Sequence, residues 1–216
     1  MSKKVTLSFD DGPNPESTHA VLDVLAAHGI KSSFFSICSK LDDPDARAAA
    51  ARAVEEGHWY GSHSHCHKTP MGWMEDFDQA IAEIDLGFDA LGDLATPERM
   101  YRPFGFGGVL DTRLLNPVAV QHLLDRGYRC VLWDFTPREW NNADSWVEMC
   151  LEYCAQKEWS CLALRDSEQT IGDRIDALVV GLKNNGYEIV QEFPEHVMPI
   201  ANGEILLDIA DYVATK

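Results

Sequence analysis

Two short motifs in the first third of the chain hold the residue types that metal-assisted hydrolysis needs. The first, Phe9-Asp10-Asp11-Gly12-Pro13, places two adjacent carboxylates at the end of an apolar run. The second, His63-Ser64-His65-Cys66-His67, holds two histidines four positions apart. Imidazole and carboxylate groups are common ligands of divalent metals, and a second carboxylate can serve as a general base. The two motifs together predict a metal-dependent hydrolase.

Asp11, His63 and His67 are the predicted metal ligands, because two nitrogens and one carboxylate oxygen are typical of a catalytic zinc site with one open position. The i, i+4 spacing of the histidines would make them converge if they share one helical turn. Asp10 and Asp11 leave the strand end in different directions, so one can bind a metal while the other faces the reacting water. We expect one divalent ion, with Zn²⁺ as the first choice and Co²⁺, Ni²⁺ or Mn²⁺ as alternatives. Without a metal, residues 10–13 would be an ordinary solvated turn.

The composition narrows the class of protein. The chain has 216 residues, which suits a single domain over 1–216, with 199–216 as a C-terminal tail or capping helix. A net charge of −17 disfavours nucleic-acid and membrane partners. The start does not read as a signal peptide, so we expect a cytoplasmic protein with all six cysteines reduced. A small acylated amine or an oligosaccharide fits such a protein as substrate, and the oligomeric state is left open.

Short apolar runs alternate with longer helical ones along the chain. Strands are predicted at Val5–Asp10, Ser32–Ile37, Trp59–His63, Met100–Phe104, Cys130–Phe135, Ser160–Leu164 and Glu188–Phe193. Helices are predicted at Glu16–His28, Pro44–Glu56, Glu75–Leu91, Pro117–Arg126, Asp144–Lys157 and Ile171–Asn185. This alternation indicates an α/β fold, and we favour a distorted or incomplete (β/α) barrel of about seven parallel strands.

Polar residues recur where the predicted strands end, which is the edge where such sheets carry their functional groups. They are Asp10, Asp11, His63, Arg102, Asp134, Arg165 and Asp166. The tail from Pro199 contains a weakly amphipathic stretch, Ile205–Val213, which we interpret as a capping helix or an interface element.

The two opening motifs resemble those of the polysaccharide deacetylase family, also called the NodB-homology or carbohydrate esterase family 4 fold. The resemblance runs from residue 5 to about residue 193. It implies a distorted (β/α) barrel and metal-assisted removal of an N-acetyl group from an amino sugar. In that family the first aspartate, here Asp10, is the general base, and Asp11, His63 and His67 hold the metal.

The later motifs of the family can also be read in this chain. The third appears as Arg102-Pro103-Phe104-Gly105, where the arginine orients the base and the Phe104 N–H helps to hold an oxyanion. In the fourth, Glu139 stands where an aspartate usually pairs with that arginine, and Trp140 forms a groove wall. The resemblance thus implies catalytic roles for Asp10, Arg102 and Glu139. It implies substrate contacts for Phe104, Trp140, Leu164 and Arg165.

The fifth motif departs from the family, because it reads Leu164-Arg165-Asp166 where the family has Leu-His-Asp. The family's histidine protonates the leaving amine, whereas an arginine stays charged at neutral pH and cannot cycle a proton. Arg165 could instead stabilise an oxyanion or bind a substrate carboxylate. The alternatives to an amino-sugar deacetylase are a metal-binding pseudoenzyme and a hydrolase of another acylated amine or cyclic amide. A non-haem iron site would suit the same ligands but not this α/β alternation.

Overall fold

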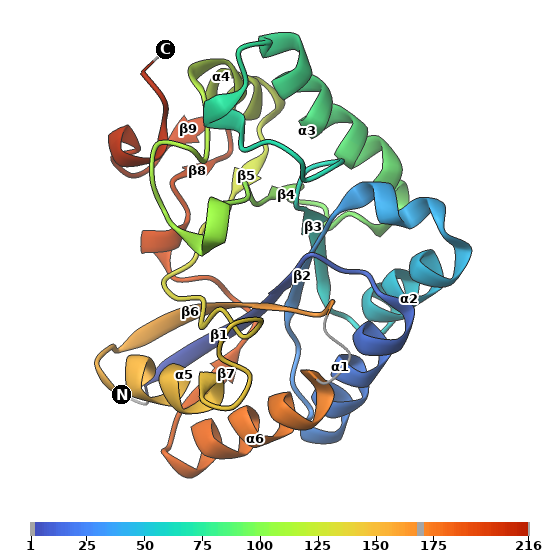
Figure 1. The fold of residues 1–216 in the computed structure, drawn as a ribbon, viewed down its shortest axis with the longest axis vertical. Coiled ribbons are helices and arrows are strands. Elements are labelled where there is room, and N and C mark those ends of the chain that lie inside the picture. Colours follow the sequence, from blue (N-terminus) through green and yellow to red (C-terminus); the bar gives the residue numbers. More distant parts are fainter. Residues whose placement is uncertain (1–2, 168–170, 216) are drawn as a thin grey trace.

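The computed structural model describes residues 3–167 and 171–215, and its centre is a curved sheet of parallel strands with helices packed outside it (Figure 1). The parallel strands are β1 (Lys4–Asp10), β2 (Ser33–Ser36), β3 (Trp59–Ser62), β4 (Met100–Tyr101), β5 (Arg129–Cys130), β6 (Trp159–Arg165) and β7 (Glu188–Val190). The order across the sheet is β6-β1-β2-β3-β4-β5, and every one of these neighbours is parallel. The predicted α/β class is confirmed.

The sheet is a distorted and incomplete barrel rather than a regular one. Strand β7 pairs with the first half of β1, and β2 pairs with its second half, so two strands share one edge of β1. The two sides of the barrel approach each other where Phe135, beyond β5, forms a single parallel bridge with Leu162 of β6. The expected incomplete (β/α) barrel is therefore what the structure has.

The helices begin and end where the sequence signals place them. They are α1 (Pro15–His28), α2 (Pro44–Glu55), α3 (Phe77–Leu91), α4 (Pro117–Arg126), α5 (Trp146–Ala155) and α6 (Ile171–Asn184). The Asn14 side chain accepts from two backbone N–H groups at the start of α1, and Gly29 closes that helix in the left-handed conformation. Asn116 and Gly127 act in the same way on α4. These caps fix the loops that connect helices to the strand ends.

Two predicted strands beside the site are much shorter than expected, and a buried arginine accounts for the second. Met100–Tyr101 is the part of the predicted Met100–Phe104 that forms a strand, and β5 is Arg129–Cys130, so only Cys130 of the predicted Cys130–Phe135 lies in it. The Arg102 guanidinium takes the carbonyl oxygens of Val131 and Leu132 as acceptors, at 3.2 and 3.1 Å. Carbonyls used in this way cannot continue a strand ladder, so the chain becomes irregular beside the site.

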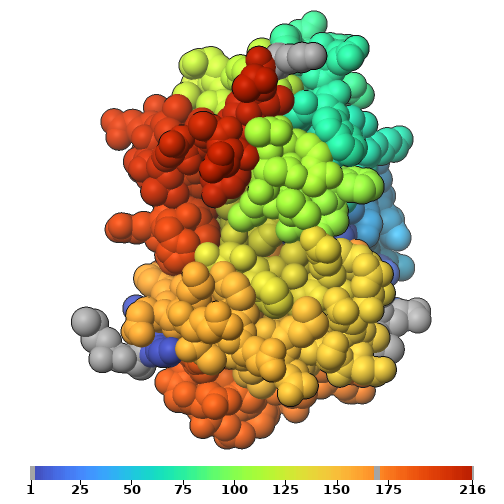
Figure 2. Space-filling view, turned by 60° about the vertical axis from the view of Figure 1, so that its left-hand side comes forward, coloured from blue at the N-terminus to red at the C-terminus, as the bar shows by residue number. Residues whose placement is uncertain are grey.

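The C-terminal segment is not a capping helix. Strand β8 (Ile200–Ala201) pairs antiparallel with β5, and β9 (Glu204–Ile205) folds back on β8. The stretch Ile205–Val213, interpreted as a capping helix or an interface element, contains the end of β9 and a 3₁₀ turn at Ala210–Tyr212. Val213 bridges to Leu115, and Figure 2 shows the red C-terminal residues lying against the green segment that precedes α4. The segment therefore covers the β5 side of the barrel.

One contact between an outer helix and the sheet bears on the site. Helix α3 packs beside β3, and a Cβ atom added at Gly87 would lie only 2.6 Å from Ser62 Oγ. Ser62 ends β3 directly before His63, so glycine at position 87 allows the helix to approach the strand that carries a candidate ligand.

Two further features concern the cysteines and the apolar character of the helices. All six cysteines are free thiols, as expected for a reduced protein. Among the described residues, no helix is both long and apolar enough to cross a membrane.

Candidate metal and catalytic site

Asp10 and Asp11 lie at the carboxyl end of β1, where the strand gives way to the loop before α1. Asp10 is the last residue of the strand and is 8% exposed. Asp11 turns away from it with a φ of 69°, in the left-handed region that most side chains avoid. The Lys40 ammonium group donates to the Asp11 carbonyl oxygen at 2.6 Å and so helps to hold this backbone. The two neighbouring carboxylates therefore point in different directions, as the sequence predicted.

His63 and His67 come from the loop that follows β3, and this loop is not helical as we had expected. Ser64 and His67 both have positive φ, at 63° and 53°. The Cys38 N–H donates to the Ser64 carbonyl at 3.0 Å, and the His63 N–H donates to the Ser36 carbonyl at 2.7 Å. The histidines thus converge through a tight loop pinned to the end of β2, which replaces the single helical turn.

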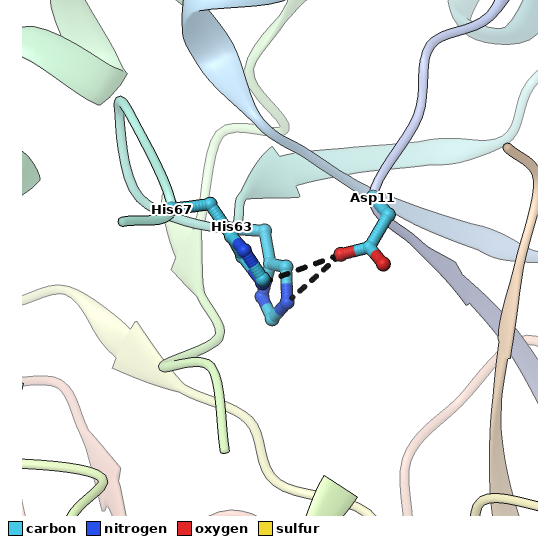
Figure 3. A group of neighbouring side chains, drawn as sticks. All are labelled: Asp11, His63 and His67. Carbon is cyan, nitrogen blue, oxygen red and sulfur yellow. Dashed lines mark ion pairs between the residues drawn. The ribbon is translucent and has the colours of Figure 1, made fainter. Parts of the chain in front are cut away.

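The three predicted ligands come together (Figure 3). The Asp11 carboxylate points at both imidazole rings, with Oδ1 at 3.6 Å from His63 Nε2 and 3.3 Å from His67 Nε2. One donor atom of each residue lies within 4.8 Å of the other two. Ligands at about 2.1 Å from a tetrahedral ion lie roughly 3.4 Å apart. The spacing of these donors therefore fits one small divalent ion.

The imidazoles are prepared to act as ligands. His63 Nδ1 lies 2.9 Å from the Arg102 carbonyl oxygen, which can only accept, so Nδ1 carries the proton and leaves Nε2 free for a metal. The His67 ring stacks on Phe104 with centroids 3.9 Å apart. Burial, and after it the neighbouring His63, lowers the pKa of His67 to about 4. The His67 ring can thus offer a lone pair at neutral pH.

Asp10 is held by the buried Arg102. The Arg102 side chain is fully buried, and its Nη1 donates at 2.8 Å both to Asp10 Oδ1 and to Ser8 Oγ. Nε and Nη2 each donate to one of the two carbonyls described above, so four of the five N–H groups of Arg102 have acceptors. The Asp10 carboxylate is thereby fixed beside the ligand cluster without being part of it.

Glu139 does not pair with Arg102, so that expectation is corrected. Its Oε1 accepts from Arg165 Nε at 3.1 Å instead. The irregular segment after β5 brings its own carbonyls to Arg102, where the family pattern implied the Glu139 carboxylate. Burial raises the pKa of Glu139, and the attraction of Arg165 opposes this. Glu139 therefore supports Arg165, not the base.

Arg165 occupies the position of the family's missing histidine and is tied to several neighbours. Its Nη1 lies 3.5 Å from Asp11 Oδ2, and its guanidinium carbon stacks 3.8 Å from the centre of the Trp140 ring. With Glu139, these contacts orient a permanent cation toward a metal ligand. Sequence reasoning identified Arg165 as the altered residue but not this pairing.

A pocket of about 120 Å³ opens over these groups. Its lining contains the predicted residues Asp10, Asp11, His63, His67, Phe104, Trp140, Leu164 and Arg165. It also contains Trp133, Thr136, Ala163 and the glycines at 105, 107 and 108, which the motifs had not singled out. The Trp133 indole donates to the Gly108 carbonyl at 3.3 Å. The fourth motif runs from Trp133 to Trp140, so the sequence contained a signal that could have identified Trp133 as a residue of the pocket.

Other polar residues near the strand ends serve the structure. Asp134 accepts from the Cys161 N–H at 2.7 Å and pairs with His196 at 2.8 Å. Asp166 is buried and accepts from the Thr18 hydroxyl at 2.5 Å, and burial raises its pKa to about 6. His65 does not belong to the ligand group. The strand-end pattern therefore identified the correct edge but included residues with a structural role.

The comparisons with known proteins agree with this geometry. The family model described as "Polysaccharide deacetylase" matches residues 1–114, more than half of the chain. The chain belongs to the polysaccharide deacetylase family. The matched half contains Asp10, Asp11, His63, His67 and Arg102, while Glu139 and Arg165 lie beyond it.

The chain is similar in sequence to two curated relatives and in fold to one solved structure. It is 27% identical over 192 residues to the peptidoglycan-N-acetylglucosamine deacetylase PgdA of Listeria monocytogenes, covering 88% of this chain but 38% of that protein. It is 29% identical to a chitooligosaccharide deacetylase of Rhizobium leguminosarum bv. trifolii, covering 69% of this chain and 66% of the other. A family 4 carbohydrate esterase from Streptomyces lividans, solved in complex with acetate, has the same fold. Its TM-score is 0.74 at 22% identity, and the match covers 92% of this chain and 97% of that one.

Proposed function

We propose that this chain is a metal-dependent hydrolase of non-peptide C–N bonds that deacetylates an N-acetylated amino sugar or a small oligosaccharide. The observation that carries the proposal is the convergence of Asp11, His63 and His67 at the floor of a pocket, beside an Asp10 carboxylate fixed by Arg102. The relatives that bear deacetylase names act on peptidoglycan and chitooligosaccharides, which supports a saccharide substrate.

Asp11, His63 and His67 would hold the ion, for which Zn²⁺ is the first choice and Co²⁺, Ni²⁺ or Mn²⁺ are alternatives. When bound, such an ion supplies Lewis acidity, which polarises the acyl carbonyl and lowers the pKa of water toward about 7. Asp10, which is not among the ligands, accepts the proton of the attacking water. Arg102 keeps the Asp10 carboxylate aimed at the pocket through the 2.8 Å hydrogen bond.

Two further groups act on the acyl carbon. The Phe104 N–H has no acceptor within the described part of the chain and borders the pocket, so it can donate to the oxygen that becomes negative. Leu164 and Trp140 line the same pocket and would contact the acyl methyl group. The proton that the leaving nitrogen needs cannot come from Arg165, so Asp10 returns the one it took from water, or solvent supplies it.

Arg165 supports a second candidate, a metal-binding protein without turnover or a hydrolase of another acylated amine or cyclic amide. Its cation sits where a proton donor would be needed, at 3.5 Å from Asp11. A substrate whose leaving group is less basic than a sugar amine would not need that donor. Cytoplasmic location stays a prediction from sequence.

The proposed function is tested by loading the purified protein with Zn²⁺ or Co²⁺ and measuring acetate release from N-acetylglucosamine oligomers and from simple acylated amines. The matched control is Asp10→Asn, which keeps the three ligands. Acetate release that requires both metal and Asp10 supports the deacetylase. Bound metal with no hydrolysis of any compound supports the non-catalytic alternative, and turnover that survives Asp10→Asn removes Asp10 as the base.

A further inference from the structure

One short segment, Ser36–Lys40, is bonded to both of the loops that carry the candidate ligands. It begins at the last residue of β2 and continues into the 3₁₀ turn that follows. Toward the loop after β1, the Ile37 N–H donates to the Gly12 carbonyl at 3.0 Å. In the same loop, the Lys40 ammonium group donates to the Asp11 carbonyl at 2.6 Å. We call Ser36–Lys40 the bridging segment.

The bridging segment is bonded to the histidine loop through its backbone. The Cys38 N–H donates to the Ser64 carbonyl at 3.0 Å. The Ser39 N–H donates to the His65 carbonyl at 2.9 Å. These bonds add to the one between His63 and the end of β2 described above. Because one segment is bonded to both loops, its geometry sets how far the aspartate loop lies from the histidine loop.

Lys40 differs from the rest of the bridging segment because its bond comes from a side chain. Asp11, whose carbonyl it binds, has a φ of 69°, a conformation that is costly for a residue with a Cβ and persists only where its surroundings hold it. A charged donor makes a stronger hydrogen bond than a neutral one. Lys40 is half-buried, and among the described residues it forms no ion pair with a carboxylate. Its ammonium group is therefore committed to the Asp11 backbone.

We propose that Lys40 is a positioning residue of the metal site, which holds the Asp11 backbone so that the Asp11 carboxylate faces His63 and His67. The lining of the pocket does not include Lys40, so it acts through Asp11 and not on the substrate. If the bond were lost, Asp11 could relax toward an ordinary backbone conformation and turn its carboxylate away from the two imidazoles. The proposal rests on the proposed function only in assuming that these three residues hold the ion.

The direction of the effect on metal affinity separates positioning from simple charge. Lys40 places a cation beside a candidate ligand, so removal of this charge alone would tighten the binding of a dication. Removal of a group that orients a ligand weakens metal binding instead, typically by about 10–100-fold. The two explanations of Lys40 therefore predict changes of opposite sign.

The experiment is isothermal titration with Zn²⁺ of the unmodified protein, Lys40→Met and Lys40→Arg. We expect the dissociation constant to rise by about 10–100-fold in Lys40→Met, whereas Lys40→Arg keeps a charged donor and should stay within about threefold. The matched control is Lys3→Met, which should change nothing. Lys3 also donates from its ammonium group to a backbone carbonyl, that of Ala155 at 2.8 Å, but it lies at the opposite end of β1 from Asp11.

Two further measurements make sure that the variants report on the site. Circular dichroism shows whether each variant is folded, and Lys40→Ala replaces Lys40→Met if the latter is not. The visible absorption spectrum of the Co²⁺-loaded protein reports the geometry of the ligands. This spectrum should change in Lys40→Met and should be the same as that of the unmodified protein in Lys3→Met and Lys40→Arg.

Zn²⁺ binding that is unchanged or tighter in Lys40→Met would overturn the proposal, and so would an equal weakening in Lys3→Met. Acetate release from the same proteins lets the two proposals fail separately. Metal affinity that depends on Lys40 without any acetate release would support the positioning role and remove the deacetylase. Acetate release together with Zn²⁺ affinity that is indifferent to Lys40 would leave the deacetylase and remove the positioning role.

Discussion

The pocket has two sides that are supported in different ways. On the ligand side, which comprises Asp10, Asp11, His63, His67 and Arg102, the buried Arg102 fixes Asp10 through its guanidinium group and His63 through its backbone carbonyl. On the arginine side, which comprises Glu139, Trp140 and Arg165, a permanent cation is shared among carboxylates and an aromatic ring. The family model covers the ligand side and ends at residue 114, before the arginine side begins.

The difference between the two sides concerns proton transfer. The ligand side has the groups that activate water, and it is arranged as the family's motifs imply. The arginine side has lost the group that would protonate a leaving amine, and its carboxylate Glu139 now holds the replacement. In the proposed reaction the ligand side would activate the water, and the arginine side would supply no proton to the leaving amine. Each prediction below changes one side and leaves the other intact.

The largest effect is expected from Asp11→Ala. Removal of one of three ligands should abolish stoichiometric metal binding, with a loss of activity of more than about 10³-fold if the chain is a hydrolase. Metal content after gel filtration, measured by plasma emission spectrometry, checks this. Glu98→Ala changes an exposed acidic residue outside the ligand group and serves as the control. Metal retained in full by Asp11→Ala would show that the ligand assignment is wrong.

The second prediction compares how much each of the two arginines contributes to the free energy of unfolding. Arg102→Met should destabilise the protein by about 3–5 kcal/mol, because it leaves the buried Asp10 charge without its partner. Arg165→Met should cost only about 1–2 kcal/mol, because burial already raises the pKa of Glu139 and the carboxyl can become neutral. Urea denaturation gives both values. Equal costs would mean that the two sides are not supported differently.

The pH dependence of Arg165→Met follows from the same cause. Without the cation, the pKa of Glu139 in the folded state rises further above its unfolded value. The folded state then binds more protons than the unfolded state, so stability is lost as the pH rises through the folded pKa. The variant should thus be closest to the unmodified protein at low pH. A destabilisation that does not change with pH would mean that Glu139 is not the responsible group.

The third effect concerns turnover. Arg165→His should raise kcat on acetylated amino sugars by about 10–100-fold, because it restores a group that can donate a proton at neutral pH. The variant's pH–rate profile should gain an alkaline limb that the unmodified protein lacks. Arg165→Gln removes the charge but supplies no proton, and should show no such gain. If Arg165→His also shows none, the arginine side has been rebuilt for another substrate.

The smallest effect is on metal affinity. Arg165 places a cation 3.5 Å from Asp11 Oδ2, where it competes electrostatically with a bound dication. Arg165→Gln should therefore tighten metal binding by about threefold to tenfold, whereas Arg165→Lys, which keeps the charge, should change it less. Isothermal titration with Zn²⁺ measures the dissociation constants. Weaker binding in Arg165→Gln would show that the arginine organises Asp11 instead of repelling the ion.

The ligand side could be predicted from sequence because residue type and spacing determine it. Asp11, His63 and His67 have few roles other than metal binding in this pattern, and strand ends of a parallel sheet meet at one edge. The helical turn expected for His63–His67 was wrong, because the loop follows contacts with the end of β2 that no local pattern shows. The length of the predicted strand Cys130–Phe135 was overestimated for the same reason, since the Arg102 side chain, which is distant in sequence, takes its carbonyls.

For the arginine side, the sequence predicted which residues are present but not which of them pair with each other. The sequence showed that residue 165 is an arginine, but the choice between Arg102 and Arg165 as the partner of Glu139 depends on where the irregular segment after β5 places its backbone. The contact between the exposed rings of Trp73 and Phe106 was not foreseen at all. Trp73 and Phe106 belong to loops after different strands, and only the packed barrel sets their rings 5.6 Å apart.

Gly87 connects the metal ligands to the outer surface of the barrel. A methyl group at this position would press on Ser62, the residue before His63, although position 87 touches neither metal nor substrate. A substitution that changes the packing of α3 at position 87 would therefore also shift Ser62 and, with it, the neighbouring His63. The packing of α3 and the position of His63 are thus linked, and a library that replaced Gly87 to stabilise the helix would also alter binding of the proposed metal ion.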